Sequence, residues 1–437
     1  MKSNFYIVIS AQFFSSLADS ALLLVAISAL ESLRAPLWFT PILKLLFVLP
    51  YIVLAAFVGA FADSMPKGRV MFIANAIKIT GCSMMFFGVH PLISYGIAGL
   101  GAAAYSPAKY GIVTELLPPE RLVAANGWIE GSTVLSIILG TGLGGILVSG
   151  AHIYKSAHLT VLAAMDPWSA ALLILGILYL IAAAFNLGIK NTGAKYSRQL
   201  HNPVALISEF SDCFAALWKD RLAQISLAMT TLFWGVGACL QFIVLKWAEY
   251  SLGVTLAGST IFVVIVAMGV TIGAGLAAWL VPLRKAMTIL PIGAIIGLCI
   301  SILAFVNRDY ISALDVSIFP GLHLQLLILI SYALLFIIGV LSGFFLVPMN
   351  ALLQHRGHVL LSAGHSIAVQ NFNENISILV LLAIYSAGIW ISIPVNILIF
   401  GFGFLVVAIS TLILLWHSIN DRQSADALLQ RSASEHS

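Results

Sequence analysis

The chain has 437 residues, of which 61% are hydrophobic and only 9% are charged, and its mean hydropathy is +1.05. This composition excludes a water-soluble globular protein, because too few polar side chains are present to cover a water-facing surface. We therefore expect an all-α protein that crosses a membrane many times.

Charged residues are concentrated in short segments between apolar stretches of about 20 residues, the length that crosses a hydrocarbon core of about 30 Å as a helix. The first stretch carries Asp19 in its apolar body, and no small-residue cleavage pattern follows it, so we interpret it as a membrane span and not as a signal peptide. The twelve predicted spans are 5–29, 41–62, 70–89, 93–116, 122–149, 167–189, 223–248, 257–281, 286–306, 323–347, 362–389 and 393–417.

Basic residues lie mainly on one side of these spans. With the N-terminus inside, fourteen Lys and Arg residues fall on the inner side and four on the outer side. Since basic loops stay in the cytoplasm, both termini are predicted to be cytoplasmic. The net charge of +4 then reflects topology and not nucleic-acid binding. The inner residues are Lys2, Lys67, Arg69, Arg121, Lys190, Lys195, Arg198, Lys219, Arg221, Arg284, Lys285, Arg356, Arg422 and Arg431, and the outer ones are Arg34, Lys44, Lys155 and Arg308.

The four cysteines, Cys82, Cys213, Cys239 and Cys299, have no CxxC spacing. They indicate neither a disulfide framework nor a metal site. We expect no metal and no cofactor, and we expect the three cysteines within spans to act as small packing residues.

The longest inner connection divides the chain. It separates a predicted N-terminal six-helix bundle, 1–190, from a C-terminal one, 223–418, with a linker at 191–222 and a polar tail at 419–437. Within the linker, apolar residues recur every three or four positions, which predicts an amphipathic helix over 205–218 lying flat on the inner membrane surface. These residues are Leu206, Ile207, Phe210, Cys213, Phe214, Leu217 and Trp218.

The two halves resemble each other. GAFADSMPKGRVM at 59–71 has a degraded counterpart, GLAAWLVPLRKAM, at 275–287. Six plus six helices related in parallel is the internal repeat of the major facilitator architecture, and the first of these segments resembles the signature loop of that superfamily. The resemblance implies a conformational role for Gly59, Asp63, Lys67 and Arg69, as a charge network at an inner gate.

Five further runs resemble the bacterial lysophospholipid transporter family, LplT. They are KGRVMFIAN (67–75), GLGAAAYSPAKYGI (99–112), LVAANGWIEGST (122–133), FFLVPMNALLQHRG (344–357) and IAVQNFNEN (367–375). The resemblance implies a transporter that moves lyso forms of phosphatidylethanolamine to the cytoplasmic side of the inner membrane for reacylation. It also implies a sideways path, in which the acyl tail stays in lipid.

Such a headgroup has a phosphate anion and an ammonium cation, so its site needs both charge signs. An ionisable residue within a span is costly and therefore a functional candidate. We predict Lys109 as the phosphate ligand and Asp19 or Glu374 as the ammonium ligand. The alternative for each is a buried pair that only holds helices together. The full predicted set is Gln12, Asp19, Tyr105, Lys109, Glu130, Gln241, Asn350, Gln370, Asn371 and Glu374.

Two other lysines lie within spans. We expect Lys78 to extend its ammonium toward the cytoplasmic surface and Lys246 to lie at a solvated rim. One departure from the family concerns Gln241, which occupies the place of an arginine opposite Asp19. Glutamine cannot neutralise Asp19, so either Lys109 balances this charge or Asp19 is protonated.

Three functions compete. A lysophospholipid flippase is the first, and a proton-coupled exporter of drugs or small amphiphiles, with Asp19 and Glu374 as proton carriers, is the second. A membrane enzyme is the third, but the sequence has no His-x4-Asp run and no GxSxG elbow, so we expect no enzyme. The expected partners are the lysophospholipid, the bilayer and a cytoplasmic acyltransferase or acyl-ACP synthetase, with the chain itself a monomer.

Overall fold

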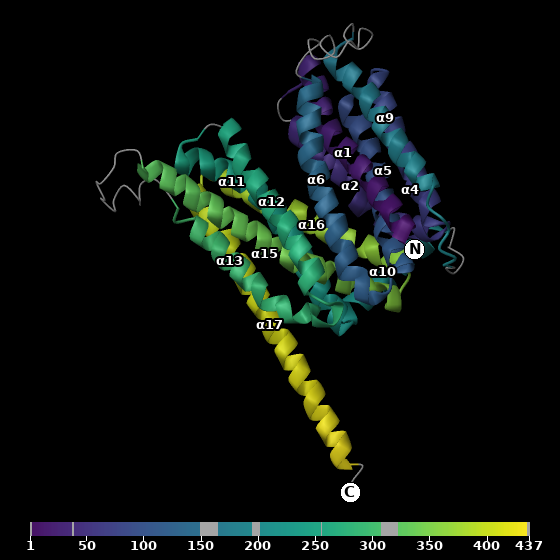
Figure 1. Cartoon of the computed structure of the whole chain (residues 1–437), viewed down its shortest axis with the longest axis vertical. Helices are drawn as coiled ribbons and strands as arrows, with labels where there is room; N and C mark the ends of the chain where they lie inside the picture. The colour runs from purple at the N-terminus through teal and green to yellow at the C-terminus, as the bar shows by residue number, and fades with distance from the viewer. Residues whose placement is uncertain are drawn as a thin grey trace. The chain divides into compact units, whose positions relative to one another are not determined.

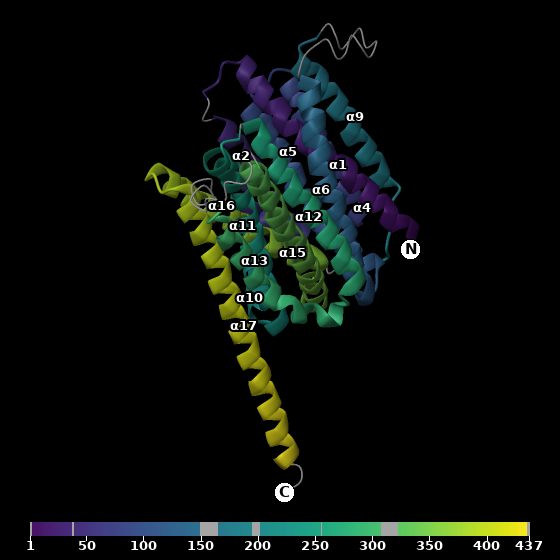
Figure 2. The same cartoon turned by 60° about the vertical axis from the view of Figure 1, so that its left-hand side comes forward.

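The computed structural model describes residues 2–36, 39–148, 165–194, 202–254, 256–306 and 322–434, and all regular structure in these ranges is helical (Figures 1 and 2). Lys155, Lys195, Arg198 and Arg308 of the charge count lie outside the described residues. The α-helices are α1 (Lys2–Ser32), α2 (Phe39–Val53), α3 (Ala55–Asp63), α4 (Lys67–Phe86), α5 (Pro91–Leu116), α6 (Leu122–Val148), α9 (Pro167–Leu187), α10 (Pro203–Lys219), α11 (Arg221–Leu252), α12 (Leu256–Leu280), α13 (Leu290–Leu303), α15 (Leu322–Leu360), α16 (Ala363–Trp390) and α17 (Val395–Ser434).

The predicted all-α, multi-pass fold is confirmed. Nine described helices are long and apolar enough to cross a membrane, and a bent pair, α2 with α3, makes ten. The pair bends by 65° at Leu54, whose φ of −106° and ψ of 12° leave the helical region. The other two predicted spans coincide with α4 and α5, which are less apolar because they carry polar residues such as Lys78 and Lys109.

The chain divides into two compact units. The first comprises Met1–Ala223 with Asn350–Ile376, and the second comprises Gln224–Met349 with Ser377–Ser437. The end of α15 and the start of α16 therefore belong to the first unit, whereas the sequence analysis assigned 223–418 to one bundle. Those bundle boundaries stay a prediction.

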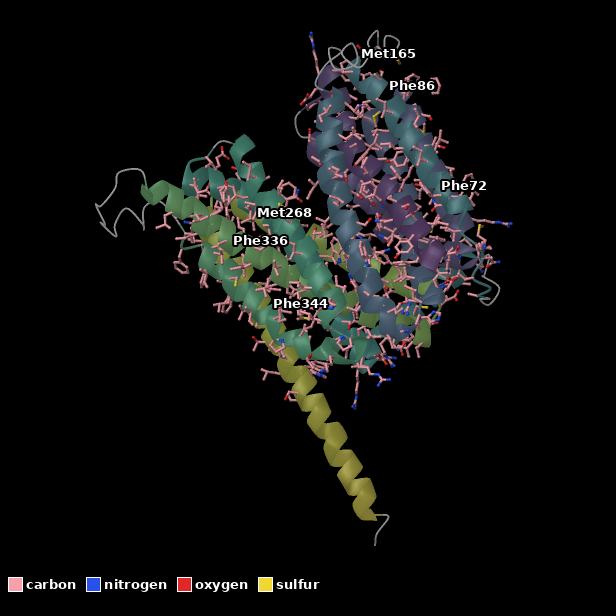
Figure 3. The ribbon with its side chains drawn as sticks, viewed as in Figure 1. Phe72, Phe86, Met165, Met268, Phe336 and Phe344 are labelled. Carbon is pink, nitrogen blue, oxygen red and sulfur yellow. The ribbon has the colours of Figure 1, made fainter. Side chains whose placement is uncertain are left out.

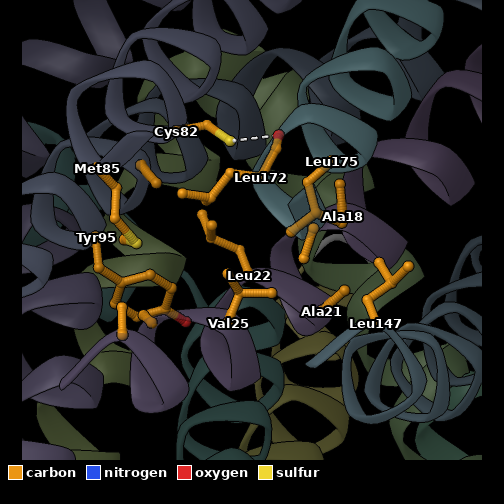
Figure 4. Packing of buried hydrophobic residues seen from close by; sticks show 14 of the residues in the cluster. Ala18, Ala21, Leu22, Val25, Cys82, Met85, Tyr95, Leu147, Leu172 and Leu175 are labelled. Carbon is orange, nitrogen blue, oxygen red and sulfur yellow. Dashed lines mark hydrogen bonds between the residues drawn. The ribbon is translucent and has the colours of Figure 1, made fainter. Parts of the chain in front are cut away.

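The core of the first unit forms where α1 packs against α6 and α9, and α4 against α5. Leu22 of α1 lies there among Met85 of α4 and Tyr95 of α5 (Figure 4). The thiol of Cys82 donates a hydrogen bond to the Leu172 carbonyl oxygen at 3.2 Å, which fits a packing role for this cysteine. The core fixes the five helices α1, α4, α5, α6 and α9, which carry the polar residues around Asp19 and Lys109 described below.

Large apolar side chains also cover the outside of the helices. Met268, Trp279 and Trp390 are 51%, 81% and 85% exposed, and Figure 3 shows Met268 with Phe336 and Phe344 on the neighbouring pair α12 and α15. Exposed apolar surface of this kind is stable when lipid covers it.

Glycines bring α12 and α15 of the second unit into backbone contact. Gly269 and Gly273 on α12 face Gly339 and Gly343 on α15, and a Cβ atom at any of these positions would overlap the backbone of the other helix. Small residues at four-residue spacing are the usual means of close helix packing in membranes.

We therefore expect Gly273→Leu to destabilise the second unit by about 3 kcal/mol, at the upper end of the cost of overpacking a core. Gly275→Leu is the matched control, because a Cβ there would meet no atom within 4 Å. The measurement is the thermal unfolding midpoint of purified protein in detergent. Equal midpoints for the two variants would show that the α12–α15 contact is not tight.

Within the linker, residues 203–219 form the helix α10, and part of its apolar face contacts protein. Phe210 and Phe214 each pack edge-on against Phe372 of α16, with ring centroids 5.4 and 6.2 Å apart, and Cys213 and Leu217 are buried. The helix also packs against α3. A position at the membrane surface stays a prediction, but the apolar face that suggested it contacts protein.

Candidate functional site

An ion pair lies in the interior of the first unit, between α1 and α4. Lys78 Nζ lies 2.6 Å from Asp19 Oδ2 and also donates a hydrogen bond to Ser15 Oγ at 2.9 Å. The Tyr179 hydroxyl of α9 donates to Asp19 Oδ1 at 2.8 Å. Both carboxylate oxygens of Asp19 are therefore occupied, and its side chain is still 18% exposed.

Two predictions were wrong here. Lys78 does not extend its ammonium to the surface, since it is only 2% exposed and is enclosed by Asp19 and by the rings of Tyr105 and Tyr179. Asp19 does not lack a basic partner, so neither Lys109 nor protonation is needed to balance its charge. The three-residue spacing of Asn75 and Lys78 on α4 was the available signal, because it places both on one helix face.

Gln12 shares a helix face with Asp19 but contacts a different helix. Its amide nitrogen donates hydrogen bonds to Ser16 Oγ at 3.0 Å and to Thr133 Oγ1 of α6 at 2.8 Å. It therefore ties α1 to α6 beside the ion pair and does not join the pair itself.

Lys109 is also buried, but it packs against an aromatic ring and not against a carboxylate. Its Nζ lies 4.0 Å from the centroid of the Tyr110 ring, and the Tyr110 hydroxyl donates a hydrogen bond to Glu130 Oε1 at 2.9 Å. Lys109 is 8% exposed, and among the described residues it makes no hydrogen bond or ion pair within 4 Å. Its main partner is thus an aromatic face, a contact of about 0.5–2 kcal/mol.

A third set of polar side chains connects α16 to the end of α15. Gln370 Nε2 donates hydrogen bonds to Asn350 Oδ1 at 3.0 Å and to Glu374 Oε1 at 2.7 Å. Asn371 donates to Ser106 Oγ of α5 at 2.9 Å. The structure thus brings together the predicted residues of α15 and α16, and all of them are buried.

A cluster around Asp63 connects α3 and α4 to the first turn of α16. Asp63 forms an ion pair with Lys67, accepts hydrogen bonds from Ser362 Oγ at 2.5 Å and from the Gly364 N–H at 3.1 Å, and lies 3.1 Å from His365 Nδ1. Lys67 also lies 3.7 Å from Glu115 of α5. We call Asp63, Lys67, Glu115, Ser362 and His365 the Asp63 cluster.

Asp63 caps the N-terminus of α16. Its carboxylate lies at the N-terminus of α16, where unpaired N–H groups and the helix dipole favour negative charge. Gly59 permits the approach, because a Cβ there would lie 3.2 Å from the His365 Cα atom. Arg69, the other predicted member, is exposed.

Helix α10 contacts the same region through charged residues. Glu209 Oε1 lies 3.8 Å from His365 Nε2, and Asp220, directly after α10, forms a two-point ion pair with Arg356 of α15. Partial burial opposes ionisation of Asp220, but the hydrogen bonds from Arg356 and from the Ala223 N–H hold the pKa of its carboxyl below the ordinary 3.8.

Arg356→Gln should therefore lower stability by about 1 kcal/mol at neutral pH, the upper range for a partly exposed pair. Because the folded pKa of Asp220 is depressed, the pair contributes above the ordinary value of 3.8 and its contribution is lost as the pH falls through the folded pKa. The measurement is the unfolding midpoint of both proteins at neutral and at acidic pH. A difference that is the same at every pH would exclude Asp220 as the partner.

Comparisons with known proteins identify the family of this chain. The family model of the Major Facilitator Superfamily matches residues 8–380. The lysophospholipid transporter LplT of Yersinia enterocolitica serotype O:8 is 41% identical over 389 residues, covering 89% of this chain and 88% of that protein. LplT of Yersinia pestis strain Pestoides F is 40% identical, with 89% and 87% covered. The chain belongs to the LplT family of the major facilitator superfamily.

Solved structures place the LplT family chain in the same fold class. A bacterial homologue of the iron transporter ferroportin, in an outward-facing state, has a TM-score of 0.68 at 13% identity and covers 95% of this chain and 99% of that one. The major facilitator transporter FucP, in an outward conformation, has a TM-score of 0.66 at 15% identity, with 93% and 97% covered. Identities this low bear on the fold alone.

One predicted site residue, Gln241, does not belong to the first unit, which contains all the others. Gln241 lies on α11 in the second unit, and its side chain is exposed. Its predicted place opposite Asp19 stays a prediction. Tyr105 is placed beside Lys78, with its ring centroid 5.1 Å from Nζ.

Proposed function

We propose that this chain is a lysophospholipid transporter that moves lysophosphatidylethanolamine from the outer to the inner leaflet of a bacterial inner membrane. Both termini then lie in the cytoplasm, where an acyltransferase or acyl-ACP synthetase would reacylate the delivered lipid. The proposal is supported by identity of 40–41% over most of the chain to proteins named lysophospholipid transporters, and by the many apolar helices.

The observation that carries the proposal at the level of residues is the environment of Lys109. A buried lysine whose nearest partner is a tyrosine ring retains hydrogen-bonding capacity for an anion, and a lipid phosphate supplies one. Glu130, Lys78, Asp19 and Glu374 all lie close enough to act on the Lys109 charge. A zwitterionic headgroup can pair its phosphate with a lysine and its ammonium with a carboxylate of this set, and its binding leaves the total charge of the site unchanged.

We assign the ammonium of the substrate to Asp19. The Asp19 carboxylate is the part of the buried ion pair that remains partly exposed, at 18%. An ammonium that approaches Asp19 would compete with Lys78 for the same oxygens, and this competition would keep binding reversible. Gln370 and Glu374 would contact the headgroup from α16.

We assign the gate to the Asp63 cluster. Its five residues link α3, α4 and α5 to the start of α16. A second link of the first unit is Asn126 of α6, which exchanges two hydrogen bonds of 2.8 and 2.9 Å with Gln354 of α15. Release of the lipid on the cytoplasmic side would require both groups of contacts to open.

The proton-coupled exporter is the weaker alternative. Both oxygens of the Asp19 carboxylate are already occupied, one by the Lys78 ammonium and one by the Tyr179 hydroxyl. A proton-carrier role for Asp19 would require these contacts to break in every transport cycle.

The test is uptake of labelled lysophosphatidylethanolamine by spheroplasts that express the protein, with vector-only spheroplasts as control. We expect uptake above the control, and we expect it to persist when an ionophore collapses the proton gradient. Uptake equal to the control would overturn the proposal, and uptake abolished by the ionophore would favour the exporter.

A further inference from the structure

A group of buried polar atoms without partners lies beside the Asp19–Lys78 ion pair. Asn75 Nδ2, the Tyr105 hydroxyl and both amide atoms of Asn186 make no hydrogen bond within the described part of the chain. Asn75 and Asn186 are 0% exposed and Tyr105 is 3% exposed. These atoms come from three different helices, α4, α5 and α9.

The atoms belong to one continuous polar region. Lys78 Nζ donates to Ser15 Oγ at 2.9 Å, and Ser15 Oγ donates to Asn75 Oδ1 at 2.8 Å, which leaves the Asn75 amide nitrogen as the unused end. On the other side, Lys78 Nζ lies 5.1 Å from the Tyr105 ring, whose hydroxyl lies beside the Asn186 amide without a hydrogen bond of normal geometry.

Four unpaired atoms are too costly to be left unsatisfied in such a place. Each buried donor or acceptor without a partner loses the hydrogen bonds that water gives it in the unfolded chain, so four such atoms together would cost a large part of the stability of an ordinary domain. Lipid offers no hydrogen bonds to offset this cost.

The chemistry of the group selects its ligand. Two amide nitrogens donate, one amide oxygen accepts, and the tyrosine hydroxyl does either. A cation is disfavoured by the donors and by the nearby Lys78, and an anion by the amide oxygen and by Asp19. Water satisfies both kinds of atom and typically makes about three hydrogen bonds in buried polar sites.

We propose that Asn75, Tyr105 and Asn186 form a binding site for ordered water behind the Asp19–Lys78 pair. Water bound there can form a hydrogen bond with Lys78 when the contact between Lys78 and Asp19 breaks. When Asp19 turns toward a substrate ammonium, a step that rests on the proposed function, the water oxygen accepts from the Lys78 ammonium and compensates Lys78 for part of what it loses. Without this compensation, separating a buried pair is strongly unfavourable.

The test is X-ray hydroxyl-radical footprinting of the full-length protein in lipid nanodiscs, read by mass spectrometry, without any substrate. Radicals form from water, so we expect Tyr105 to be modified about tenfold faster than a tyrosine without bound water. Tyr95 is the matched control, because it is also 3% exposed but lies in the apolar core. Rates for Tyr105 as low as those for Tyr95 would overturn the proposal.

A variant provides the second arm. Asn186→Leu removes both amide atoms, so the modification rate of Tyr105 should fall to that of Tyr95. Asn191→Leu, in an exposed loop, should leave the rate unchanged. A Tyr105 rate that is unaffected by Asn186→Leu would also overturn the site. If Asn186→Leu does not fold, the wild-type comparison of the two tyrosines still decides. Because no lipid is transported in this assay, its failure is separate from a failure of the proposed function.

Discussion

Replacing Lys109 by alanine should reduce lysophospholipid uptake by about tenfold to a hundredfold, which corresponds to the loss of one charge-assisted hydrogen bond of about 1.5–3 kcal/mol. The expected cause is the loss of the central cation for the lipid phosphate. Folding should be preserved, since Lys109 has no carboxylate within ion-pair distance in the described residues, so no buried charge loses its direct partner. Lys109→Arg should keep part of the rate, because arginine also binds phosphate.

The measurement is the initial uptake rate at matched expression, together with the unfolding midpoint of each variant. Lys246→Ala is the control. This lysine is exposed and lies 3.3 Å from Glu249 on the same helix, so its removal should change neither quantity. A wild-type uptake rate for Lys109→Ala would mean that this lysine serves only to pack against Tyr110.

Replacing Lys78 by methionine should destabilise the protein by about 3–5 kcal/mol, the usual cost of removing one partner of a buried pair. The methionine keeps the volume but leaves the Asp19 carboxylate with the Tyr179 hydroxyl as its one remaining side-chain donor among the described residues. Asp19→Asn combined with Lys78→Met should recover most of the loss, because no charge remains unpaired. The measurement is the unfolding midpoint of the two single variants and the double variant.

The same double-mutant comparison distinguishes Lys78 from Lys109 as the partner of Asp19. The coupling free energy between Asp19 and Lys78 should be clearly non-zero, whereas Asp19→Asn and Lys109→Gln should be additive in stability within about 0.5 kcal/mol. Strong coupling of Asp19 to Lys109, with none to Lys78, would contradict the observed pairing and restore the interpretation based on sequence.

The positions of the helices could be predicted from sequence because apolar length is a local property. Each predicted span falls on one α-helix, except 41–62, which comprises the bent pair α2 and α3, and the amphipathic linker helix was found from its periodicity. The family could also be recognised locally, from runs such as 99–112, whose matching depends only on the order of residues.

The partners of the polar residues could not be predicted in the same way. Lys78 lies 59 positions from Asp19, and only the packing of α4 on α1 decides that they meet. The apolar face of α10 shows the same limit, because periodicity reveals that Phe210 and Phe214 share a face but not whether lipid or Phe372 covers it. A bend such as that at Leu54 depends on two backbone angles that the composition of the span does not fix.

Helix α4 supplies the lysine of two ion pairs, Lys67 with Asp63 and Lys78 with Asp19. Eleven residues separate the two lysines, which is about 16 Å at a rise of 1.5 Å per residue. A helix this short moves as a rigid rod, so a tilt that draws Lys67 away from α3 also changes the distance between Lys78 and α1. In the proposed mechanism, opening of the Asp63 cluster and the change of partner at Lys78 would then be one movement of α4.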